Sequence, residues 1–482
     1  MEKMELMNQV EQYISDHRTE ILEDLKTLVR FPSVSREGAD GLPFGRECAR
    51  VLDKALEMAK EKGFQVNNHD YWYGTAFLGS EQNDKGLIGI FSHLDVVEAG
   101  DGWIYDPFEP TEVDGFLIGR GAGDNKSGAV IGMYTMKILQ ELNIPLKSSV
   151  MLYFGCNEEH GMKDAEKFAK EHLMPDYSMV PDLFFPVCHG EKGNLKFKIA
   201  PKTGFSAIHS VFAGDAENKI PGQAEALIPF DENLFAACKI LVATHPDIRV
   251  EAKDGMIRIT ALGKGGHSAM PKGTVNAIWL LMRFLKEVDG LPDHDREIAA
   301  AYEKLLSDTD GIALGIDWSD EPSGSLVCSA VMARTEGNVP NILFSARYPV
   351  TDFRERIENA LEAAVDSQMF EIRIVSNNDP MYIPEDDHYV QTLMNVYQEV
   401  TGNTDRKTYI IDGGTYARKL KNAVGYGGGN GVSATFLPAG HGRVHQPDEA
   451  RNIQGILEAI KIYVMSVIEL DQLIQKEKGA QA

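Results

Sequence analysis

Asp124 is the first carboxylate whose position in the chain could serve chemistry. Glycines at positions 119, 121 and 123 precede it and leave the backbone free to bend tightly. Residues 126–141 carry an apolar stripe at helical spacing, so Asp124 is predicted to stand where a loop meets a helix. A carboxylate at such a junction either caps the helix or projects into a cleft. From this stretch alone, capping is the simpler interpretation. The other polar side chains of the sequence decide between capping and projection into a cleft.

A histidine and an aspartate follow a short apolar run in the sequence SHLDVV, residues 92–97. The run 87–92 predicts a strand buried on both faces, and open α/β sheets bind ligands beyond the carboxyl ends of such strands. Two residues apart on an extended chain, His93 and Asp95 point the same way. We therefore expect His93 to bind a metal and Asp95 to accept its other N–H, which fixes the tautomer. A hydrogen-bonded surface pair is the alternative.

Two adjacent glutamates follow a second predicted strand, 149–155, in the sequence GCNEEHGM. Neighbouring carboxylates repel each other unless a cation lies close by. Because adjacent side chains diverge, one of Glu158 and Glu159 could bind a metal while the other meets a water. A solvated turn is the alternative for the pair, and His160 is an alternative ligand.

Asp182 and His445 complete the set of candidate ligands. Asp182 lies in the apolar segment PDLFFP, and an aspartate there is rarely buried unless it is paired or metal-bound. His445 lies in HGRVHQPDE, where Gly442 and Pro447 argue against a helical pair with His441. A plain loop histidine is the alternative at 445.

These side chains together predict a centre with two metal ions. Two imidazoles and three carboxylates suit Zn²⁺, with Mn²⁺ or Co²⁺ as alternatives. Two ions ~3.5–4 Å apart can hold a hydroxide and polarise a carbonyl. With Asp124 as the bridge, each ion would take one histidine and one carboxylate of its own. The candidate ligands are His93, Asp124, Glu159, Asp182 and His445.

The elements that must position these residues follow an α/β pattern. Helices are predicted at 5–30, 45–62 and 126–141, and strands at 76–78, 87–92 and 149–155, which indicates a mainly parallel sheet. After about residue 190 the pattern changes to an α+β insertion, with alternating segments at 194–215 and 249–262, a helix at 276–288 and a strand at 343–349. Helices at 388–401 and 450–475 then resume the first pattern. We predict a catalytic domain over 1–190 and 381–482, interrupted by a domain over 191–380.

Composition narrows the function classes. The chain has 482 residues, more than one core usually supports, and its net charge is −24. That charge argues against nucleic acid or an anionic membrane as a partner. The five cysteines are scattered and form no CxxC pair, which favours reduced thiols in a cytoplasmic protein. The N-terminus lacks the apolar region of a signal peptide, and no run is long and apolar enough to span a bilayer.

The sequence resembles the M20 family of metallopeptidases, and within it the PepV-like dipeptidases. The resemblance extends from about residue 25 to the C-terminus. It rests on ordered motifs at family-like spacing: SHLDVV, GWIYDPFEP, IGRGAGDNKSG, GCNEEHGM, PDLFFP, GKGGHSAMPKG, ARYPVT, DGGTYAR and HGRVHQPDE.

The resemblance implies a zinc-peptidase-like α/β catalytic domain with an inserted two-lobed lid. His93 and Asp182 would serve one metal, Glu159 and His445 the other, and Asp124 would bridge them. Asp95 would orient His93, and Glu158 would be the general base that takes a proton from the water held between the metals.

The lid would supply groups that bind the substrate. His267 would polarise the scissile carbonyl, Arg347 would bind the substrate's C-terminal carboxylate, and Asn218 would touch the substrate. Gly414 and Thr415 would line the pocket. The expected reaction is hydrolysis of dipeptides with a free C-terminal carboxylate, by a monomer or, as an open alternative, a homodimer.

Some positions depart from the family pattern and leave alternatives for specificity. Asn125 stands where many relatives have a second Asp, Asp412 replaces a usual Gly, and His160 could perturb Glu158. An N-acyl amino-acid deacylase or desuccinylase would share the metal site, as would an aminotripeptidase or carboxypeptidase. A catalytically inactive binding protein is disfavoured because every ligand position is filled.

Overall fold

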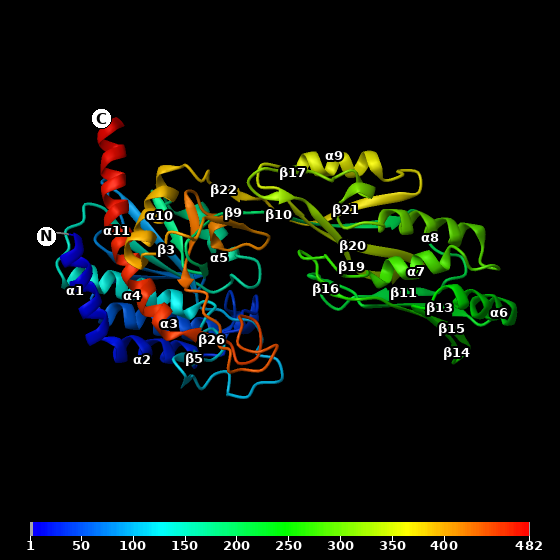
Figure 1. Ribbon diagram of the computed structural model, residues 1–482, viewed down its shortest axis with the longest axis horizontal. Helices are drawn as coiled ribbons and strands as arrows, with labels where there is room; N and C mark the ends of the chain where they lie inside the picture. Colours follow the sequence, from blue (N-terminus) through cyan, green and yellow to red (C-terminus); the bar gives the residue numbers. More distant parts are fainter. Residues whose placement is uncertain (1–2, 482) are drawn as a thin grey trace. The chain divides into compact units, whose positions relative to one another are not determined.

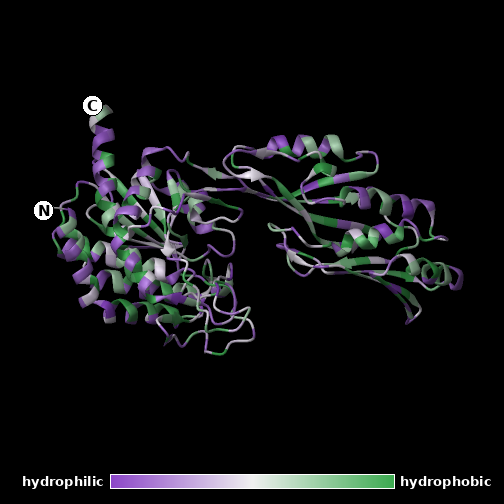
Figure 2. Cartoon of the chain, viewed as in Figure 1, coloured by the Kyte–Doolittle hydropathy of each residue, from purple (hydrophilic) through white to green (hydrophobic). Residues whose placement is uncertain are grey.

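The computed structural model describes residues 3–481, and the chain divides into two compact units. The first unit contains the described residues up to Gly190, together with Ile383–Tyr409 and those from Gly414 onward. The second unit contains Glu191–Tyr382, the green to yellow part of the chain in Figure 1, together with Ile410–Gly413. Helices in both units mix hydrophilic and hydrophobic residues along their length (Figure 2), as expected of helices with one face on a core.

The first unit is built from helices around a mixed sheet. Its helices are α1 Lys3–Asp16, α2 Arg18–Val29, α3 Arg46–Glu61, α4 Lys126–Glu141, α5 Lys163–Glu171, α10 His388–Thr401 and α11 Ile453–Gln481. Its strands are β1 Gln65–His69, β2 Tyr73–Leu78, β3 Leu87–His93, β4 Thr111–Val113, β5 Phe116–Ile118, β6 Ser149–Gly155, β7 Tyr177–Val180, β8 Leu183–Phe184, β9 Val187–Glu191, β24 Ala423–Tyr426, β25 Gly428–Gly429 and β26 Ala450–Asn452.

The strands of the main sheet run in the order β1-β2-β6-β3-β7-β24-β9. The pairs β6·β3, β3·β7 and β7·β24 are parallel, whereas β1·β2, β2·β6 and β24·β9 are antiparallel. The sheet is therefore mixed rather than mainly parallel, because antiparallel strands flank a parallel centre. The parallel centre is the part that positions the candidate ligands.

Helix α4 connects the candidate bridging residue to the core. Residues 127–136 of this helix are all buried, and it packs on β3 and on α11. The helix covers the sheet closely because Gly132 has no side chain: a Cβ there would lie 2.4 Å from Leu152 Cδ1 on β6. The buried helix fixes the position of the loop that precedes it.

The second unit contains an antiparallel sheet with the order β14-β15-β13-β11-β19-β20-β10-β21. Its helices are α6 Glu232–Leu241, α7 Ala277–Leu285, α8 Asp293–Leu305 and α9 Arg354–Ala364. Its strands are β10 Gly193–Pro201, β11 Ser210–Ala213, β12 Lys219–Ile220, β13 Gln223–Pro229, β14 Ile248–Lys253, β15 Met256–Leu262, β16 Gly266–His267, β17 Ser319–Asp320, β18 Gly324–Ser325, β19 Val327–Glu336, β20 Val339–Tyr348, β21 Phe370–Asn378 and β22 Met381–Tyr382; β23, Tyr409–Ile411, straddles the division between the units.

Several predicted elements are confirmed, and one helix is corrected in addition to the strand directions of the main sheet. The helices at 126–141 and 388–401 have the predicted bounds. The helix predicted over 5–30 is two helices that separate at His17. The alternating segment 249–262 is a hairpin of β14 and β15 with a turn at Asp254 and Gly255, both at positive φ. Among residues 3–481, no helix has both the length and the apolar character needed to cross a bilayer.

Candidate metal centre

Three neighbouring parallel strands deliver four of the candidate residues to one edge of the sheet. β3 ends at His93, and β6 ends at Gly155, directly opposite it in the register. Glu158 and Glu159 follow β6 after a short turn, and Asp182 follows β7. The carboxyl ends of parallel strands lie at the same edge, which is where α/β sheets bind ligands.

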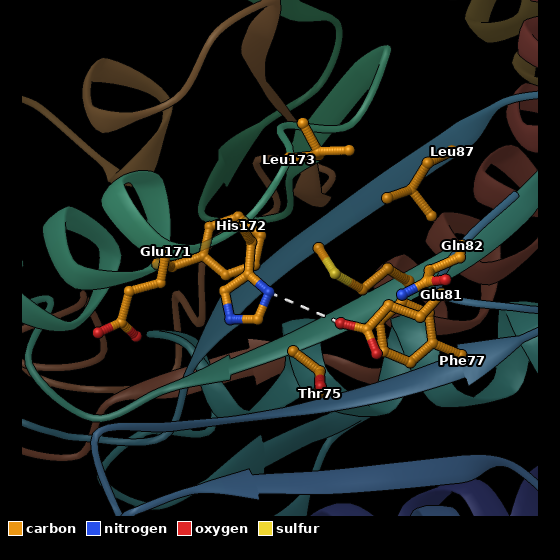
Figure 3. Close-up of a pocket in the computed structure, with 10 residues that line it drawn as sticks. Thr75, Phe77, Glu81, Gln82, Leu87, Glu171, His172 and Leu173 are labelled. Carbon is orange, nitrogen blue, oxygen red and sulfur yellow. Dashed lines mark ion pairs between the residues drawn. The ribbon is translucent and has the colours of Figure 1, made fainter. Parts of the chain in front are cut away.

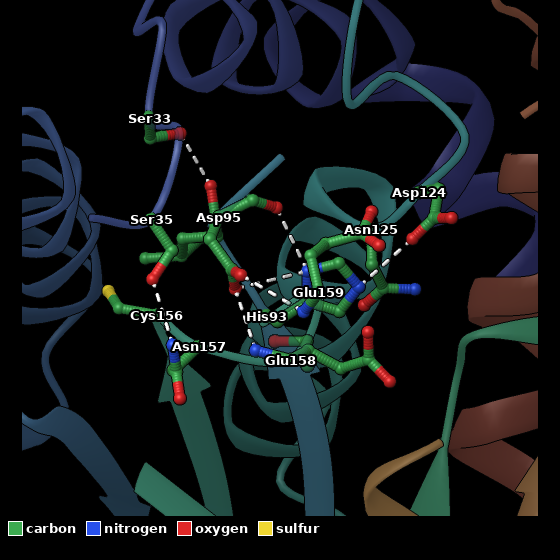
Figure 4. A network of polar contacts seen from close by, with 12 residues as sticks. Ser33, Ser35, His93, Asp95, Asp124, Asn125, Cys156, Asn157, Glu158 and Glu159 are labelled. Carbon is green, nitrogen blue, oxygen red and sulfur yellow. Dashed lines mark hydrogen bonds and ion pairs between the residues drawn. The ribbon is translucent and has the colours of Figure 1, made fainter. Parts of the chain in front are cut away.

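Asp95 contacts both His93 at the end of β3 and the turn that follows β6. The imidazole of His93 lies between Asp95 and Asp124 (Figure 4), with its Nδ1 2.9 Å from the Asp95 carbonyl oxygen and 3.4 Å from Asp95 Oδ1. The Asp95 carboxylate also accepts hydrogen bonds from the backbone N–H groups of Glu158 and Glu159, at 3.2 and 3.1 Å. Because Nδ1 faces Asp95, Nε2 of His93 is left facing the other carboxylates.

Asp124 lies between two histidines that are far apart in sequence. Its Oδ1 is 2.9 Å from His93 Nε2, and its Oδ2 is 3.0 Å from His445 Nε2. The N-cap of α4 is Asn125 and has no side-chain capping hydrogen bond, so Asp124 does not act as the helix cap. The carboxylate projects from the loop with one oxygen toward each imidazole.

The remaining two carboxylates complete two groups that share Asp124. Asp182 Oδ2 lies 3.5 Å from His93 Nε2, and Glu159 Oε1 lies 2.9 Å from His445 Nε2. In each group the candidate ligand atoms all lie within 4.8 Å of one another: His93, Asp124 and Asp182 in one, Asp124, Glu159 and His445 in the other.

The carboxylates of the centre repel one another unless positive charge lies close to them. Two like charges about 4 Å apart repel by roughly 4 kcal/mol at an effective dielectric constant of 20. That repulsion exceeds the ~1 kcal/mol that an ordinary hydrogen bond contributes. Burial and then the charge of Asp124 raise the pKa of Asp182 to about 6 and that of Glu159 to about 7. Burial also raises the pKa of Glu158 well above its ordinary value.

The histidines carry the compensating protons when no metal is bound. Hydrogen bonds to Asp124 and then Glu159 raise the pKa of His445 to about 11. Burial opposes a charge on His93, but Asp182 and Asp124 outweigh it and raise its pKa. Burial also opposes the charge on Asp124, yet the hydrogen bonds from both histidines lower its pKa. A divalent ion in each group would replace a proton with a stronger positive charge, so the donor set fits two such ions.

The supporting roles of two residues were not predicted from the sequence. Buried Glu449 accepts hydrogen bonds from the backbone N–H groups of Gly123 and Asp124, at 2.8 and 3.0 Å, and pairs with Arg120 at 2.6 Å. The amide of Asn125 donates to Asp182 Oδ1 at 2.9 Å and to the Pro181 carbonyl at 2.6 Å. The departure at position 125 therefore places a donor on Asp182. The sequence signals were that Glu449 lies in the motif HGRVHQPDE and that Asn125 departs from the family pattern.

The loop at 414–416 contributes a buried aromatic residue beside the centre. The Tyr416 ring packs edge-on against His93, with centroids 6.2 Å apart, and its hydroxyl donates to Asp164 at 2.5 Å. Thr415 Oγ1 accepts from the Ala417 N–H and caps the short helix that follows. Gly414 belongs to the same loop of the first unit.

The second unit brings its own predicted residues together. Lys219 on β12 pairs with His267 on β16, and the carbonyl of the preceding residue, Asn218, accepts from the Ser268 N–H at 2.9 Å. Burial and then the positive charge of Arg347 lower the pKa of His267, while Asp412 opposes them. Arg347 is itself buried on β20, with Nη1 3.4 Å from Ser345 Oγ. These predicted substrate-binding residues belong to a different unit from the ligands.

Two other histidine-bearing places lie outside the centre. His160 is exposed and belongs to neither group of candidate ligands. A pocket beside Leu87, at the opposite end of β3 from His93, contains His172, whose Nδ1 lies 3.6 Å from Glu81 Oε1 (Figure 3). None of the five candidate ligands lines that pocket.

Comparisons with known proteins identify a family and its relatives. The chain matches the family described as "Peptidase family M20/M25/M40" over residues 89–469. It is 30% identical over 471 residues to a Bacillus subtilis protein named "Putative dipeptidase YtjP", covering 94% of this chain and 97% of that protein. A Staphylococcus aureus protein, "Putative dipeptidase SAB1611c", is 28% identical over 472 residues, covering 95% of this chain and 98% of that one.

Solved structures share the fold at lower identity. Human carnosine dipeptidase 1 superposes with a TM-score of 0.56 at 18% identity, over 97% of this chain and 100% of the other. The di-peptidase Dug1p from Saccharomyces cerevisiae gives a TM-score of 0.58 at 13% identity, over 97% and 98%. The family match covers most of the chain and includes all five candidate ligands, and we conclude that the chain belongs to the M20 family of metallopeptidases.

Proposed function

We propose that the candidate metal centre binds two divalent ions. His93 and Asp182 serve one ion, Glu159 and His445 serve the other, and Asp124 is shared. One observation supports this most directly: the two oxygens of Asp124 face the Nε2 atoms of two different histidines, at 2.9 and 3.0 Å. Mixed nitrogen and oxygen donors favour Zn²⁺, with Mn²⁺ or Co²⁺ as alternatives.

The proposed reaction is hydrolysis of the peptide bond of a dipeptide. Two bound divalent ions would supply a water of lowered pKa and a polarised carbonyl. Glu158 would be the general base that takes a proton from the attacking water and passes it to the leaving amine. Asp95 supports this step from two sides, since it holds the backbone of Glu158 and the Nδ1 side of His93.

The second unit provides the proposed substrate contacts. His267 stabilises the developing oxyanion as a hydrogen-bond donor, Arg347 binds the free C-terminal carboxylate, and Asn218 touches the substrate. Burial and then the positive charge of Arg347 lower the pKa of His267, and the influence of Arg347 supports a shared role for the two side chains. Gly414 and Thr415 of the first unit line the pocket.

The test combines metal content with product release. We expect protein reconstituted with Zn²⁺, Mn²⁺ or Co²⁺ to hold two ions per chain and to release free amino acids from a dipeptide panel. N-acyl amino acids and tripeptides serve as the competing substrates. Two bound ions with turnover confined to N-acyl amino acids would replace the dipeptidase by a deacylase, and turnover confined to tripeptides would indicate a tripeptidase.

We also propose a cytoplasmic location. All five cysteines are buried thiols, as expected of a protein from a reducing compartment. The expected partner is the small peptide substrate, because the net charge of −24 disfavours nucleic acid.

A further inference from the structure

A pocket in the first unit borders the candidate metal centre and is lined by arginines. It measures about 480 Å³, and its walls include Gly123, Phe184, Arg406, Arg443, Val444 and Arg451. None of the five proposed ligands lines the pocket, but Gly123 immediately precedes Asp124 and Val444 immediately precedes His445, so the chain neighbours of two proposed ligands form part of its wall. No Asp or Glu is among the residues that line it. Such a lining is unusual in a chain with a net charge of −24.

Arg451 is the buried cation of this pocket. Its exposed fraction is only 8%, and within residues 3–481 its Nε has no hydrogen-bond partner and no carboxylate forms an ion pair with its guanidinium. Burial lowers the pKa of Arg451, and the charges of Glu449, Asp124 and Asp182 oppose that shift. Leaving a buried cation and its donors unsatisfied is costly. An anion in the pocket would offset the positive charge of Arg451 and accept hydrogen bonds from its guanidinium.

The backbone around Arg451 is shaped to leave space for its guanidinium. The guanidinium lies against Gly428 and Gly429 of β25, where a Cβ on Gly429 would lie 2.3 Å from Nη1. β25 pairs with β8, the strand that begins directly after Asp182. The guanidinium is thus held beside the segment that carries a proposed ligand.

The other two arginines lie at the exposed rim. Arg406 donates from Nη1 to the Phe185 carbonyl at 3.0 Å and from Nη2 to the Asn430 carbonyl at 3.2 Å, which fixes its guanidinium in place. Arg443 is exposed. One buried and two exposed guanidinium groups thus surround a space large enough for a small side chain.

We propose that this pocket binds the side-chain carboxylate of an acidic residue in the substrate, so that dipeptides containing Glu or Asp are the preferred class. The inference rests on the proposed dipeptidase function. Arg347 is the proposed binding residue for the C-terminal carboxylate of the substrate. The arginine pocket is therefore assigned to a second carboxylate, that of a substrate side chain. Guanidinium groups bind carboxylates through paired, charge-assisted hydrogen bonds. Free phosphate shares this chemistry and is the competing source of the anion.

The test compares isosteric substrates on the metal-loaded, full-length protein. We expect kcat/KM for Glu-Ala, or for Ala-Glu, to exceed that for the matching Gln dipeptide at least about tenfold, because a hydrogen bond to a charged group is stronger than one to a neutral amide. Arg451→Gln should reduce this Glu-to-Gln ratio to about one, while Ala-Ala is still hydrolysed. Arg443→Ala should reduce it about threefold, since an exposed pair contributes less.

Controls and opposite outcomes separate the alternatives. Arg18→Ala removes an exposed arginine of α2 outside the pocket and should leave the Glu-to-Gln ratio unchanged. If Arg451→Gln does not fold, the Arg443→Ala ratio decides. Hydrolysis of Ala-Ala with equal rates for Glu and Gln substrates would overturn the pocket assignment alone.

Two further outcomes would also contradict the proposed preference for acidic dipeptides. If phosphate raises the Tm of the wild type but not of Arg451→Gln, and no acidic preference exists, the pocket binds a free anion and the proposal is wrong. If no dipeptide is hydrolysed, the proposed function fails, and the substrate preference fails with it.

Discussion

The two glutamates that follow β6 are adjacent in sequence but meet different neighbours. Glu159 lies 2.9 Å from His445 and belongs to one ligand group, whereas the Glu158 carboxylate belongs to neither group. Their backbone N–H groups share one acceptor, Asp95, which holds the turn while the side chains diverge. One position therefore suits a ligand and the other suits a base.

Substitution by glutamine distinguishes these two roles. Glu158→Gln keeps the size of the side chain but cannot accept a proton, so metal content should persist while kcat falls by at least about 10². Glu159→Gln should instead reduce the bound metal from two ions toward one. Elemental analysis and steady-state kinetics on both variants check this, and exchanged phenotypes would mean that the assignments are reversed.

His445 contacts both Asp124 and Glu159, so its removal should weaken metal binding by that group of ligands. His445→Ala should lose one ion and nearly all activity while the protein stays folded, because the side chain is half exposed and lies in a loop. Circular dichroism monitors the fold, and elemental analysis counts the ions. Two ions retained by a folded variant would exclude His445 as a ligand.

Metal affinity should depend on pH in a definite direction. The two carboxylates raise the pKa of His445 to about 11, so this histidine is protonated in the metal-free protein at pH 7. A metal needs the neutral imidazole, and binding must release that proton. We expect the affinity to rise about tenfold per pH unit for each proton released between pH 6 and 8. Calorimetry in buffers of different ionisation enthalpy measures the release, and an affinity independent of pH would contradict it.

The candidate ligands could be proposed from sequence because each lies at or shortly after the end of a buried strand or in a Gly-rich loop. Glu449 and Asn125 could not be given their supporting roles in the same way. Glu449 acts on backbone N–H groups more than 300 positions away, and Asn125 acts on a carboxylate 57 positions away. Only the folded chain brings such partners together.

Among the elements, helix α4 carries the geometry of the centre most directly. Gly132 brings the helix onto β6, and Asp124 stands just before its first turn. Gly132→Ala would place a methyl group 2.4 Å from Leu152 Cδ1. We expect it to lower the free energy of unfolding by about 1–3 kcal/mol, as overpacking does.

Gly479 provides the matched control for this helix. It lies in α11 with no atom within 4 Å of an added Cβ, so Gly479→Ala should be neutral or slightly stabilising. Denaturant unfolding of the two variants checks the difference. Equal stability would show that close packing at Gly132 is not required.

The two corrections at the element scale have physical causes. The apolar stripe of residues 5–30 continues through His17, whose backbone N–H and carbonyl both form i,i+4 hydrogen bonds, so the periodicity gave no sign of a break. Antiparallel β1 and β2 flank the parallel strands because a short turn at 70–72 joins them as a hairpin. Direction of pairing depends on connection length, which an apolar run by itself does not report.

At the scale of the whole molecule, the proposed roles are divided between the two units. The first unit holds the metal ligands and the general base, and the second holds His267, Arg347 and Asn218. The change in sequence pattern near residue 190 was visible because alternating β segments replace the strand–helix alternation. No comparable change of pattern marks residues 410–413, which also belong to the second unit.

Arg347 gives the last prediction, which concerns the length and terminus of the substrate. A dipeptide bears a free carboxylate one residue past the scissile bond. A guanidinium can hold that group in two parallel hydrogen bonds, a geometry that lysine cannot reproduce. The enzyme should therefore cleave dipeptides and reject their C-terminal amides. Arg347→Lys should raise KM and lower kcat, with a combined loss of at least about tenfold, because remote binding energy also positions the scissile carbonyl.

The control for this prediction is Arg373→Lys, a conservative change at an exposed arginine on β21 of the same sheet. It should leave both constants unchanged. The decisive measurement compares kcat/KM for one dipeptide and its amide on the wild type. Equal values would show that no carboxylate clamp exists, and would favour a deacylase whose pocket recognises the acyl group instead of the C-terminus.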